Sequence, residues 1–114
     1  TDWNILLNEN GGPNHVQNFC FAPIHADTQN NELIYTPTYY YIGHFSKFIE
    51  PGAKRVSTTV SRSTLESTSF QNPDGQIVTV IMNRTDETIP FKLITGELET
   101  SLEIAPHAMH TMVY

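Results

Sequence analysis

From residue 51 onward, apolar and polar side chains alternate in short runs that turn residues separate. The clearest run is 98–104, in which Leu98, Thr100, Leu102 and Ile104 alternate with Glu99, Ser101 and Glu103. Such a period of two residues predicts a strand with one buried face, and turns spaced about 8–12 residues apart are typical of an antiparallel sandwich. The strands are expected at 55–60, 65–70, 77–82, 89–93, 98–104 and 109–114. The fold class is therefore mainly β.

Two of these strands carry further information. The run 77–82 is apolar on both faces, which predicts a central strand between two layers. Pro90 has no N–H to donate, so the strand at 89–93 is expected to start there or to run along an edge. Between 65–70 and 77–82, Asn72-Pro73-Asp74-Gly75 predicts a tight hairpin turn.

Residues 1–50 differ from residues 51–114, because they hold nearly all the aromatic side chains. We place a domain boundary between these two parts. In the first part we expect a strand at 3–7, a hairpin of 21–25 with 33–35, and a helix at 37–49 that begins with Thr36 as N-cap and Pro37.

The expected helix carries one apolar stripe and one glycine. Tyr41, Phe45, Phe48 and Ile49 would share a face. Gly43 in its interior costs about 1 kcal/mol relative to Ala, which predicts a close backbone contact there.

The charge balance and the scarcity of cysteine exclude several classes of protein. Lys and Arg number 6 against 12 Asp and Glu, a net charge of −6, so no nucleic-acid partner is expected. No apolar run approaches the roughly 18 residues of a membrane-spanning helix, so no transmembrane segment is expected. The single cysteine, Cys20, excludes an internal disulfide and a cysteine-rich zinc site. Its apolar neighbours predict a buried, inert thiol.

The histidines and acidic residues do not indicate a self-contained reaction centre. His107 and His110 are three residues apart, and in a strand this spacing directs them to opposite faces, so no metal site is expected. His25 with Asp27 is interpreted as a polar pair in the hairpin, and His44 as a residue packed at the helix interface. The glutamates of the second part are expected to be exposed; they are Glu66, Glu87, Glu97, Glu99 and Glu103. No catalytic residue and no cofactor are therefore predicted.

The segment 2–19 has a composition suited to sugars, because a Trp ring packs on the C–H face of a sugar and neutral Asn amides both donate and accept hydrogen bonds. Taken alone, it could equally be a structural loop whose Asn side chains satisfy its own turns. The triplet Asn83-Arg84-Thr85 is formally an N-glycosylation sequon.

Three blocks of the sequence resemble glycoside hydrolase family 30, in particular its glucosylceramidase-like branch. The segment from Asp2 to Phe19, reading DWNILLNENGGPNHVQNF, resembles the last barrel strand and the following loop. The segments GHFSKFI at 43–49 and PGAKRV at 51–56 resemble the last barrel helix and its exit into the sandwich. NPDG at 72–75 with 78–84 resembles the sandwich hairpin.

The resemblance implies a retaining β-glycosidase that joins a (β/α)₈ barrel to a β-sandwich. Residues 1–50 would be its last β/α unit and residues 51–114 its sandwich. Its two catalytic glutamates end the fourth and seventh barrel strands, so both would lie upstream of Thr1, and this piece alone is expected to be inactive. The implied partners are a β-glucoside substrate and the rest of the barrel.

The resemblance assigns substrate-binding roles to Trp3, Asn18 and Phe19. Trp3 corresponds to a pocket-wall Trp at the end of the eighth strand, and Asn18 and Phe19 to residues reaching the pocket from the following loop. His15 stands where lysosomal glucosylceramidases usually carry Trp, so the resemblance does not specify a lipid or a glycan aglycone. It also implies that the sandwich takes strands from an N-terminal part of the longer chain.

Two alternatives remain. The chain could be a stand-alone carbohydrate-binding module that uses Trp3, Asn14 and Asn18, or a structural sandwich without a ligand. Because one strand and one helix of a barrel cannot bury their apolar faces alone, residues 1–50 are expected to be exposed, repacked on the sandwich, or completed by a longer chain. The sequence predicts no localisation.

Overall fold

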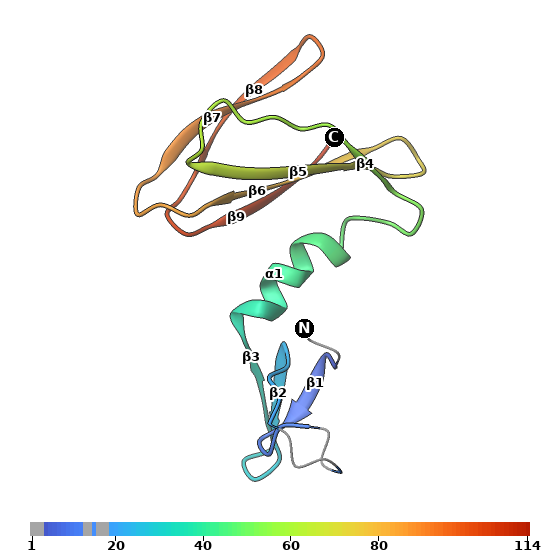
Figure 1. The fold of residues 1–114 in the computed structure, drawn as a ribbon, viewed down its shortest axis with the longest axis vertical. Coiled ribbons are helices and arrows are strands. Elements are labelled where there is room, and N and C mark those ends of the chain that lie inside the picture. The colour runs from blue at the N-terminus through green and yellow to red at the C-terminus, as the bar shows by residue number, and fades with distance from the viewer. Residues whose placement is uncertain (1–3, 13–14, 16–18) are drawn as a thin grey trace. The chain divides into compact units, whose positions relative to one another are not determined.

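The computed structural model describes residues 4–12, 15 and 19–114. It divides into two compact units, residues 1–43 and residues 44–114, which we describe separately. Figure 1 shows the order of the elements along the chain. The domain boundary expected at residue 50 stays a prediction.

The first unit contains a small three-stranded sheet in the order β1-β2-β3 (Figure 1). Its strands are β1 (Leu6–Asn8), β2 (Ile24–Asp27) and β3 (Glu32–Tyr35). The expected hairpin is confirmed, because β2 and β3 pair antiparallel with Asp27 opposite Glu32. β2 begins three residues later than predicted, at Ile24, and β3 begins one residue earlier, at Glu32.

The expected strand at 3–7 is only partly correct. The observed strand is Leu6–Asn8, and Trp3 lies outside the described residues. β1 pairs parallel with β2, with Leu6 opposite Ile24. Periodicity could not reveal this pairing, because the two strands are separated by a long loop.

The helix α1 (Pro37–Ser46) begins at the predicted proline but ends three residues before the predicted end, Ile49. The chain leaves the helix where the N–H groups of both Phe48 and Ile49 donate to the Phe45 carbonyl. The N-cap position of Thr36 is confirmed, because it directly precedes the helix and its carbonyl accepts from the Tyr39 N–H at 3.0 Å; its hydroxyl donates to the Pro23 carbonyl at 3.0 Å.

The expected close contact at Gly43 is also wrong. Among the described residues, apart from its chain neighbours and the backbone of its own helix, no atom lies within 4 Å of a Cβ placed on Gly43. α1 is described throughout and has no buried residue, and Tyr41 and Phe45 of its apolar stripe remain exposed. A stripe is buried only where another element covers it.

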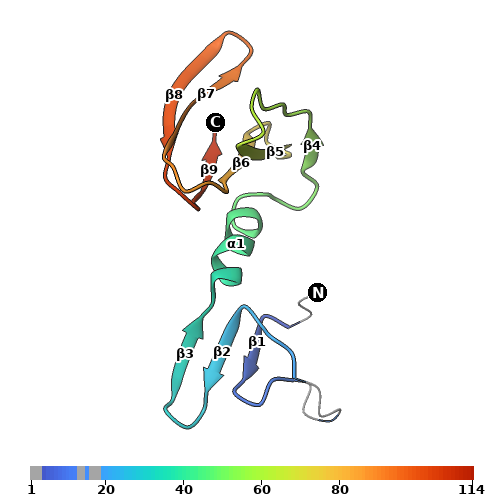
Figure 2. The ribbon, with the colours of Figure 1, turned by 60° about the vertical axis from the view of Figure 1, so that its left-hand side comes forward.

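The second unit is a β-sandwich, as predicted. One sheet has the order β4-β5-β6-β9 and the other is the ribbon β7-β8, which Figures 1 and 2 show as a separate layer. The strands are β4 (Lys54–Val56), β5 (Leu65–Gln71), β6 (Ile77–Asn83), β7 (Ile89–Thr95), β8 (Leu98–Ile104) and β9 (Met109–Val113). Every neighbouring pair is antiparallel.

The core lies between the two layers. Leu65 from β5, Ile81 from β6 and Ile104 from β8 are buried against one another. Ile89, Phe91, Ala108 and Met112 pack around them. Burial of apolar surface from both layers therefore holds the sandwich together.

The strand β6 is central, as its sequence predicted, and it is buried on both faces. Ile81 contributes to the core between the sheets, while Val78 and Val80 on the opposite face are 0% and 3% exposed. On that second face Thr111, which lies opposite Val80, bonds with His44 at 2.9 Å. The packed position of His44 is thereby confirmed.

The turn between β5 and β6 also follows the prediction. Gly75 has φ +95° and donates its N–H to the Asn72 carbonyl at 2.9 Å, which closes the turn. The Asn72 side chain is buried and bonds the Phe48 carbonyl and the Glu50 N–H, so this turn also fixes the chain segment after α1.

Two sandwich strands differ from expectation. β4 stops at Val56 rather than at residue 60, because only Lys54–Val56 pair with β5. β8 has the predicted bounds, yet Leu98 on its apolar face is 76% exposed while Ile104 is fully buried. The tip of the ribbon β7-β8 therefore has an apolar face that no described residue buries.

Pro90 lies in β7, and in the described chain β7 pairs only with β8, so the edge position is confirmed.

Candidate functional site

Of the three residues expected to bind a sugar, only Phe19 is described; Trp3 and Asn18 lie outside the described residues, as does Asn14. The Phe19 ring is 56% exposed and meets Phe21 edge to face, with ring centroids 5.2 Å apart. Phe21 in turn contacts the His25 ring at 5.6 Å. Three aromatic rings thus form a connected, partly exposed group beside the small sheet.

Gly11 explains why the Phe19 ring lies against the loop that follows β1. Its φ of +66° is a left-handed conformation, and its N–H donates to the Asn8 carbonyl at 2.9 Å. A Cβ at this position would lie 2.7 Å from the Phe19 Cδ2 atom. Only glycine therefore permits both the turn and the contact with the ring.

Glu9 lies just after β1, and its carboxylate has a structural role. One oxygen accepts from the Thr28 hydroxyl at 2.6 Å and the other from the Thr28 N–H at 3.0 Å. These bonds hold the pKa of Glu9 below its ordinary value, and the bond from the Thr28 hydroxyl contributes most. A general acid requires the opposite shift, so Glu9 is not suited to that role.

Asp27 is also structural. It accepts hydrogen bonds from the Asn30 amide at 2.7 Å and from the N–H groups of Asn30 and Gln29. These bonds, led by the Asn30 side chain, lower the pKa of Asp27. His25 does not pair with it: the His25 Nε2 atom accepts from the Ala22 N–H at 3.4 Å. The interpretation of His25 and Asp27 as a polar pair is therefore wrong, although both residues do support the hairpin.

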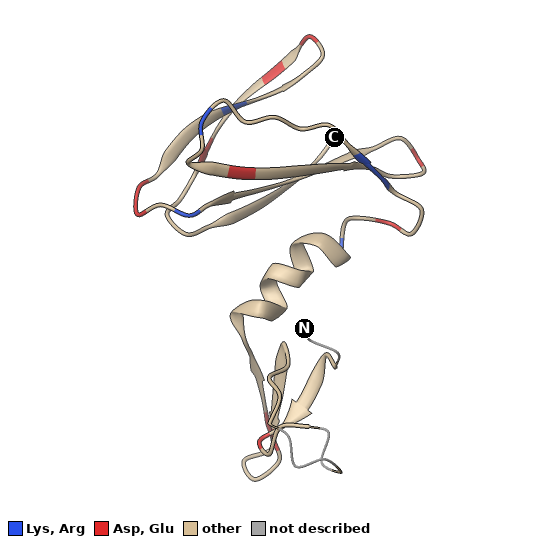
Figure 3. Cartoon of the chain, in the orientation of Figure 1, with Lys and Arg blue, Asp and Glu red and all other residues tan. Residues whose placement is uncertain are grey.

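The five glutamates named for the sandwich are all exposed, as expected. Glu66 pairs with Arg84 at 2.8 Å and Glu99 pairs with Lys92 at 2.5 Å, both on the surface. The Glu66 carboxylate raises the pKa of Arg84. Figure 3 shows acidic and basic residues dispersed over the sandwich and none on α1. The described acidic groups do not form the paired, buried arrangement that glycoside cleavage needs.

The histidines at the end of the chain do not share a site. His107 lies in the turn before β9, with φ 52°, and its Nε2 atom bonds the Asp86 carboxylate at 2.8 Å. His110 lies within β9 opposite Ile81. Among the described residues, no group of three or more His, Cys, Asp or Glu side chains could hold a metal ion.

The sequon residue Asn83 is fully buried. Its Nδ2 atom donates to the carbonyls of Glu87 at 2.7 Å and Ala105 at 2.9 Å, with Ile104 at 3.3 Å, and its Oδ1 atom accepts from the Thr85 N–H and hydroxyl. This side chain fastens three chain segments together. In the folded sandwich it is not accessible as a glycosylation acceptor.

Sequence reasoning missed two features of the first unit. The bond between Glu9 and Thr28 joins residues that are 19 positions apart, and no local pattern announces it. The aromatic pair did leave a signal: Phe19 and Phe21 are two residues apart, a spacing that places side chains on the same side of an extended segment. Cys20 between them is half-buried, less than predicted.

The described chain thus consists of a small three-stranded sheet with an exposed aromatic group, a helix, and an antiparallel sandwich. Comparison with known families agrees in both parts. Residues 1–49 match the glycosyl hydrolase family 30 TIM-barrel domain, and residues 52–112 match the glycosyl hydrolase family 30 beta sandwich domain. The chain belongs to glycosyl hydrolase family 30.

Individual relatives agree with this assignment. The chain is 40% identical over 116 residues to the lysosomal acid glucosylceramidase of Mus musculus and 32% identical over 117 residues to the putative glucosylceramidase 3 of Caenorhabditis elegans. Each alignment covers 100% of this chain and 22% of the relative. The chain therefore spans about a fifth of the length of the curated relatives it matches.

Solved structures give the same fold. SrfJ from Salmonella typhimurium matches 99% of this chain with a TM-score of 0.92 and 39% identity, over 25% of its own length. The endo-beta1,6-glucanase BT3312 matches 96% of this chain with a TM-score of 0.81 and 24% identity, again over 25% of its length, which shows similarity of fold. In the part of the chain that the structure describes, no helix has the length and apolar character needed to cross a membrane.

Proposed function

We propose that this chain is the C-terminal part of a retaining β-glycosidase of the glucosylceramidase-like type, which hydrolyses β-glucosides. In this proposal residues 1–50 form the last β/α unit of the barrel and residues 51–114 form the sandwich, and the catalytic glutamates belong to a preceding part of the polypeptide. The observation that carries the proposal is the identity of 40% with a glucosylceramidase along the whole chain.

Three side chains would contribute to the glucose pocket. Trp3 and Phe19 would offer ring faces to the C–H groups of the sugar, and Asn18 would hydrogen-bond its hydroxyls. The exposed position of the Phe19 ring and its fixation by Gly11 support this role. Enzymes with barrel folds place their sites at the C-terminal ends of the strands, where this loop begins in the family.

The described acidic groups support the placement of the reactive pair elsewhere. Retaining enzymes need two carboxyl groups about 5–5.5 Å apart, one acting as nucleophile and the other as acid and base. The carboxylates of Glu9 and Asp27 are held by turn and loop donors, and those of Glu66 and Glu99 are in surface ion pairs. These side chains are therefore assigned structural or surface roles.

The proposed partner within the enzyme is the rest of the barrel. The described part of residues 1–46 exposes many large apolar side chains: Ile5, Leu6, Phe19, Phe21, Leu33, Ile34, Tyr35, Tyr39, Tyr40, Tyr41, Ile42 and Phe45. An apolar surface of this extent is characteristic of an interface. The missing barrel strands and helices would cover it.

The proposal is tested by substituting pocket residues in the longer polypeptide that contains this chain. Trp3→Ala and Asn18→Ala should each lower kcat/KM for an aryl β-glucoside by about tenfold or more, because each removes a contact with the sugar. The control is Leu98→Ala, which removes an exposed apolar side chain from the sandwich and should leave the kinetics unchanged. Unchanged kinetics in both pocket variants would instead favour a purely structural chain.

A further inference from the structure

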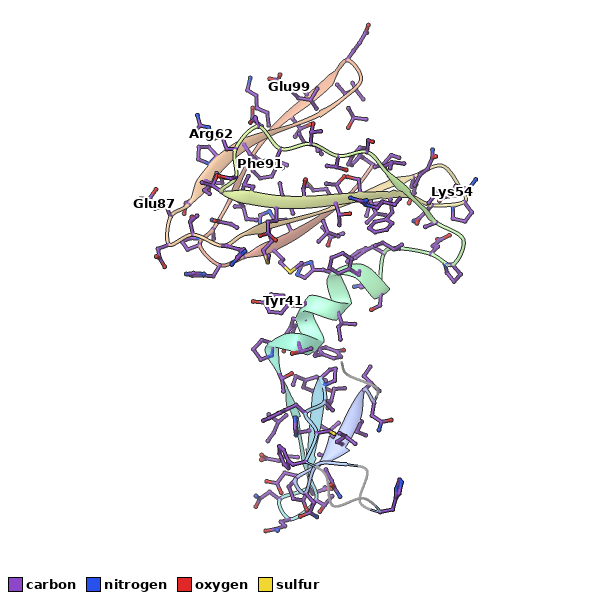
Figure 4. All side chains as sticks on the ribbon, in the orientation of Figure 1. Tyr41, Lys54, Arg62, Glu87, Phe91 and Glu99 are labelled. Atoms are coloured by element: carbon purple, nitrogen blue, oxygen red, sulfur yellow. The ribbon has the colours of Figure 1, made fainter. Side chains whose placement is uncertain are left out.

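A hollow lies at one end of the sandwich, beside the loop whose Glu87 carbonyl Asn83 binds. Its volume is about 460 Å³, within the range of about 300–1,000 Å³ typical of small-molecule sites. Its lining comes from two loops and the start of β7: Arg62 and Thr64 precede β5, residues 85–88 lie between β6 and β7, and Ile89 and Pro90 begin β7. Figure 4 shows Arg62 and Glu87 at the same end of the sandwich.

The loop between β6 and β7, which forms one wall of the hollow, is held in place by hydrogen bonds. The buried Asn83 amide donates to the Glu87 carbonyl at 2.7 Å, and its oxygen accepts from the Thr85 N–H at 2.9 Å. His107 adds a second support, because its backbone N–H donates to the Thr85 carbonyl at 3.3 Å; its ring bonds the Asp86 carboxylate at the surface. A wall fixed in this way loses little conformational freedom when it binds a ligand.

The groups that line the hollow form a mixed set. Arg62 supplies hydrogen-bond donors, Asp86 and Glu87 supply carboxylate acceptors, and Thr64 and Thr88 supply hydroxyls that do both. The carboxylates oppose an anionic ligand, and the guanidinium opposes a metal cation. Ile89 and Pro90 add apolar surface at the start of β7. A neutral ligand with many hydroxyl groups and an apolar ring face satisfies this set best.

We propose that this hollow binds a neutral sugar unit and is a second carbohydrate site of the protein, separate from the glucose pocket. The carboxylates accept from sugar hydroxyls, Arg62 donates to sugar oxygens, and Pro90 packs on a C–H face. This proposal is argued from the residues that line the hollow, so it does not depend on where the glycosidic bond is cleaved.

The test is calorimetry on the longer polypeptide with gentiobiose and laminaribiose as probes at millimolar concentration, after the active site has been filled with a covalent glucoside inhibitor. Arg62→Ala and Glu87→Gln should each weaken binding by about tenfold. The matched controls Arg84→Ala and Glu99→Gln change an exposed residue of the same type outside the hollow and should leave binding unchanged.

Several outcomes would overturn the proposal. They are an absence of heat with both disaccharides, an equal loss of binding in the control variants, or saturable binding of inorganic phosphate or Ca²⁺ without binding of sugar. Hydrolysis of an aryl β-glucoside, measured in parallel without the inhibitor, should be the same in all four variants. An absence of hydrolysis by the unaltered enzyme would refute the proposed glycosidase function. The calorimetric comparison of the variants would still test whether the hollow binds sugar.

Discussion

Asn83 is the most heavily bonded side chain of the sandwich, and its truncation should be correspondingly costly. In Asn83→Ala, the carbonyls of Glu87 and Ala105 lose their donor and the Thr85 N–H loses its acceptor. A buried polar group left without a partner costs about 1–3 kcal/mol. Because Glu87 lies at the surface and water can reach its loop, we use the lower end for each group and expect a loss of about 3–4 kcal/mol.

Asn83→Asp should be at least as damaging at neutral pH although it preserves the shape. It replaces the donor with a carboxylate oxygen that faces carbonyl oxygens, and it buries a charge. Burial and these neighbours raise the folded-state pKa of the introduced carboxyl group above its unfolded value. Stability is therefore greatest at pH below the unfolded pKa and is lost as the pH rises through the folded pKa.

The free energy of opening can be measured by native-state hydrogen exchange of the β6 amides in the longer polypeptide. Gln71→Glu is the control, since it makes the same amide-to-acid change at an exposed position of the neighbouring strand. A loss below about 1 kcal/mol for Asn83→Ala, or a loss in Asn83→Asp no greater than in the control, would refute the assigned role of Asn83.

Three further predictions concern packing, the loop after β1 and pH. Ile104→Ala should destabilise the sandwich by about 2–5 kcal/mol in denaturant unfolding, whereas Leu98→Ala on the same face of β8 should cost less than about 0.5 kcal/mol because its side chain is 76% exposed; equal losses would contradict the described core. Gly11→Ala should increase amide exchange in residues 8–12 more than Gly96→Ala does in its own turn. Both glycines have positive φ, but only the Cβ at residue 11 meets Phe19, so similar effects would argue against that contact. Because the folded-state pKa of Glu9 is depressed, its bond to Thr28 stabilises the loop at pH above the unfolded pKa, and this stabilisation is lost as the pH falls through the folded pKa. NMR titration should show this as a pH-dependent chemical shift of the Thr28 amide, and Glu9→Gln should abolish that pH dependence.

The sequence predicted the strands of the sandwich well because each has a recognisable pattern within its own few residues. The alternation in 98–104 and the double-faced apolar run in 77–82 both gave strands at nearly those bounds. Alternation identifies a face but not what covers it, however. Leu98 and Ile104 have the same place in the pattern and opposite degrees of burial.

Features that depend on distant residues could not be predicted in the same way. The parallel pairing of β1 with β2 and the bond between Glu9 and Thr28 connect segments that a long loop separates. Asn83 was noticed only as part of a sequon, because its three carbonyl partners are brought to it by the fold. The helix likewise ended before its apolar stripe did, because the N–H groups of Phe48 and Ile49 both donate to the Phe45 carbonyl and the distant Asn72 side chain binds the Phe48 carbonyl.

The candidate site was predictable only through the family resemblance. Composition singled out a segment with the single Trp and several Asn residues, but a structural loop remained open as an interpretation until the resemblance assigned positions to Trp3, Asn18 and Phe19. The resemblance to the family is confirmed by the match of both domains. The roles of the three residues stay predictions.

The most direct test of the account is the hydrolysis of an aryl β-glucoside by the 114-residue chain alone and by the longer polypeptide, side by side. The account predicts turnover by the longer polypeptide and none by the isolated chain, because the chain carries a wall of the pocket without the pair of reactive carboxyl groups. Turnover by the isolated chain that remains constant in specific activity through successive purification steps would contradict it.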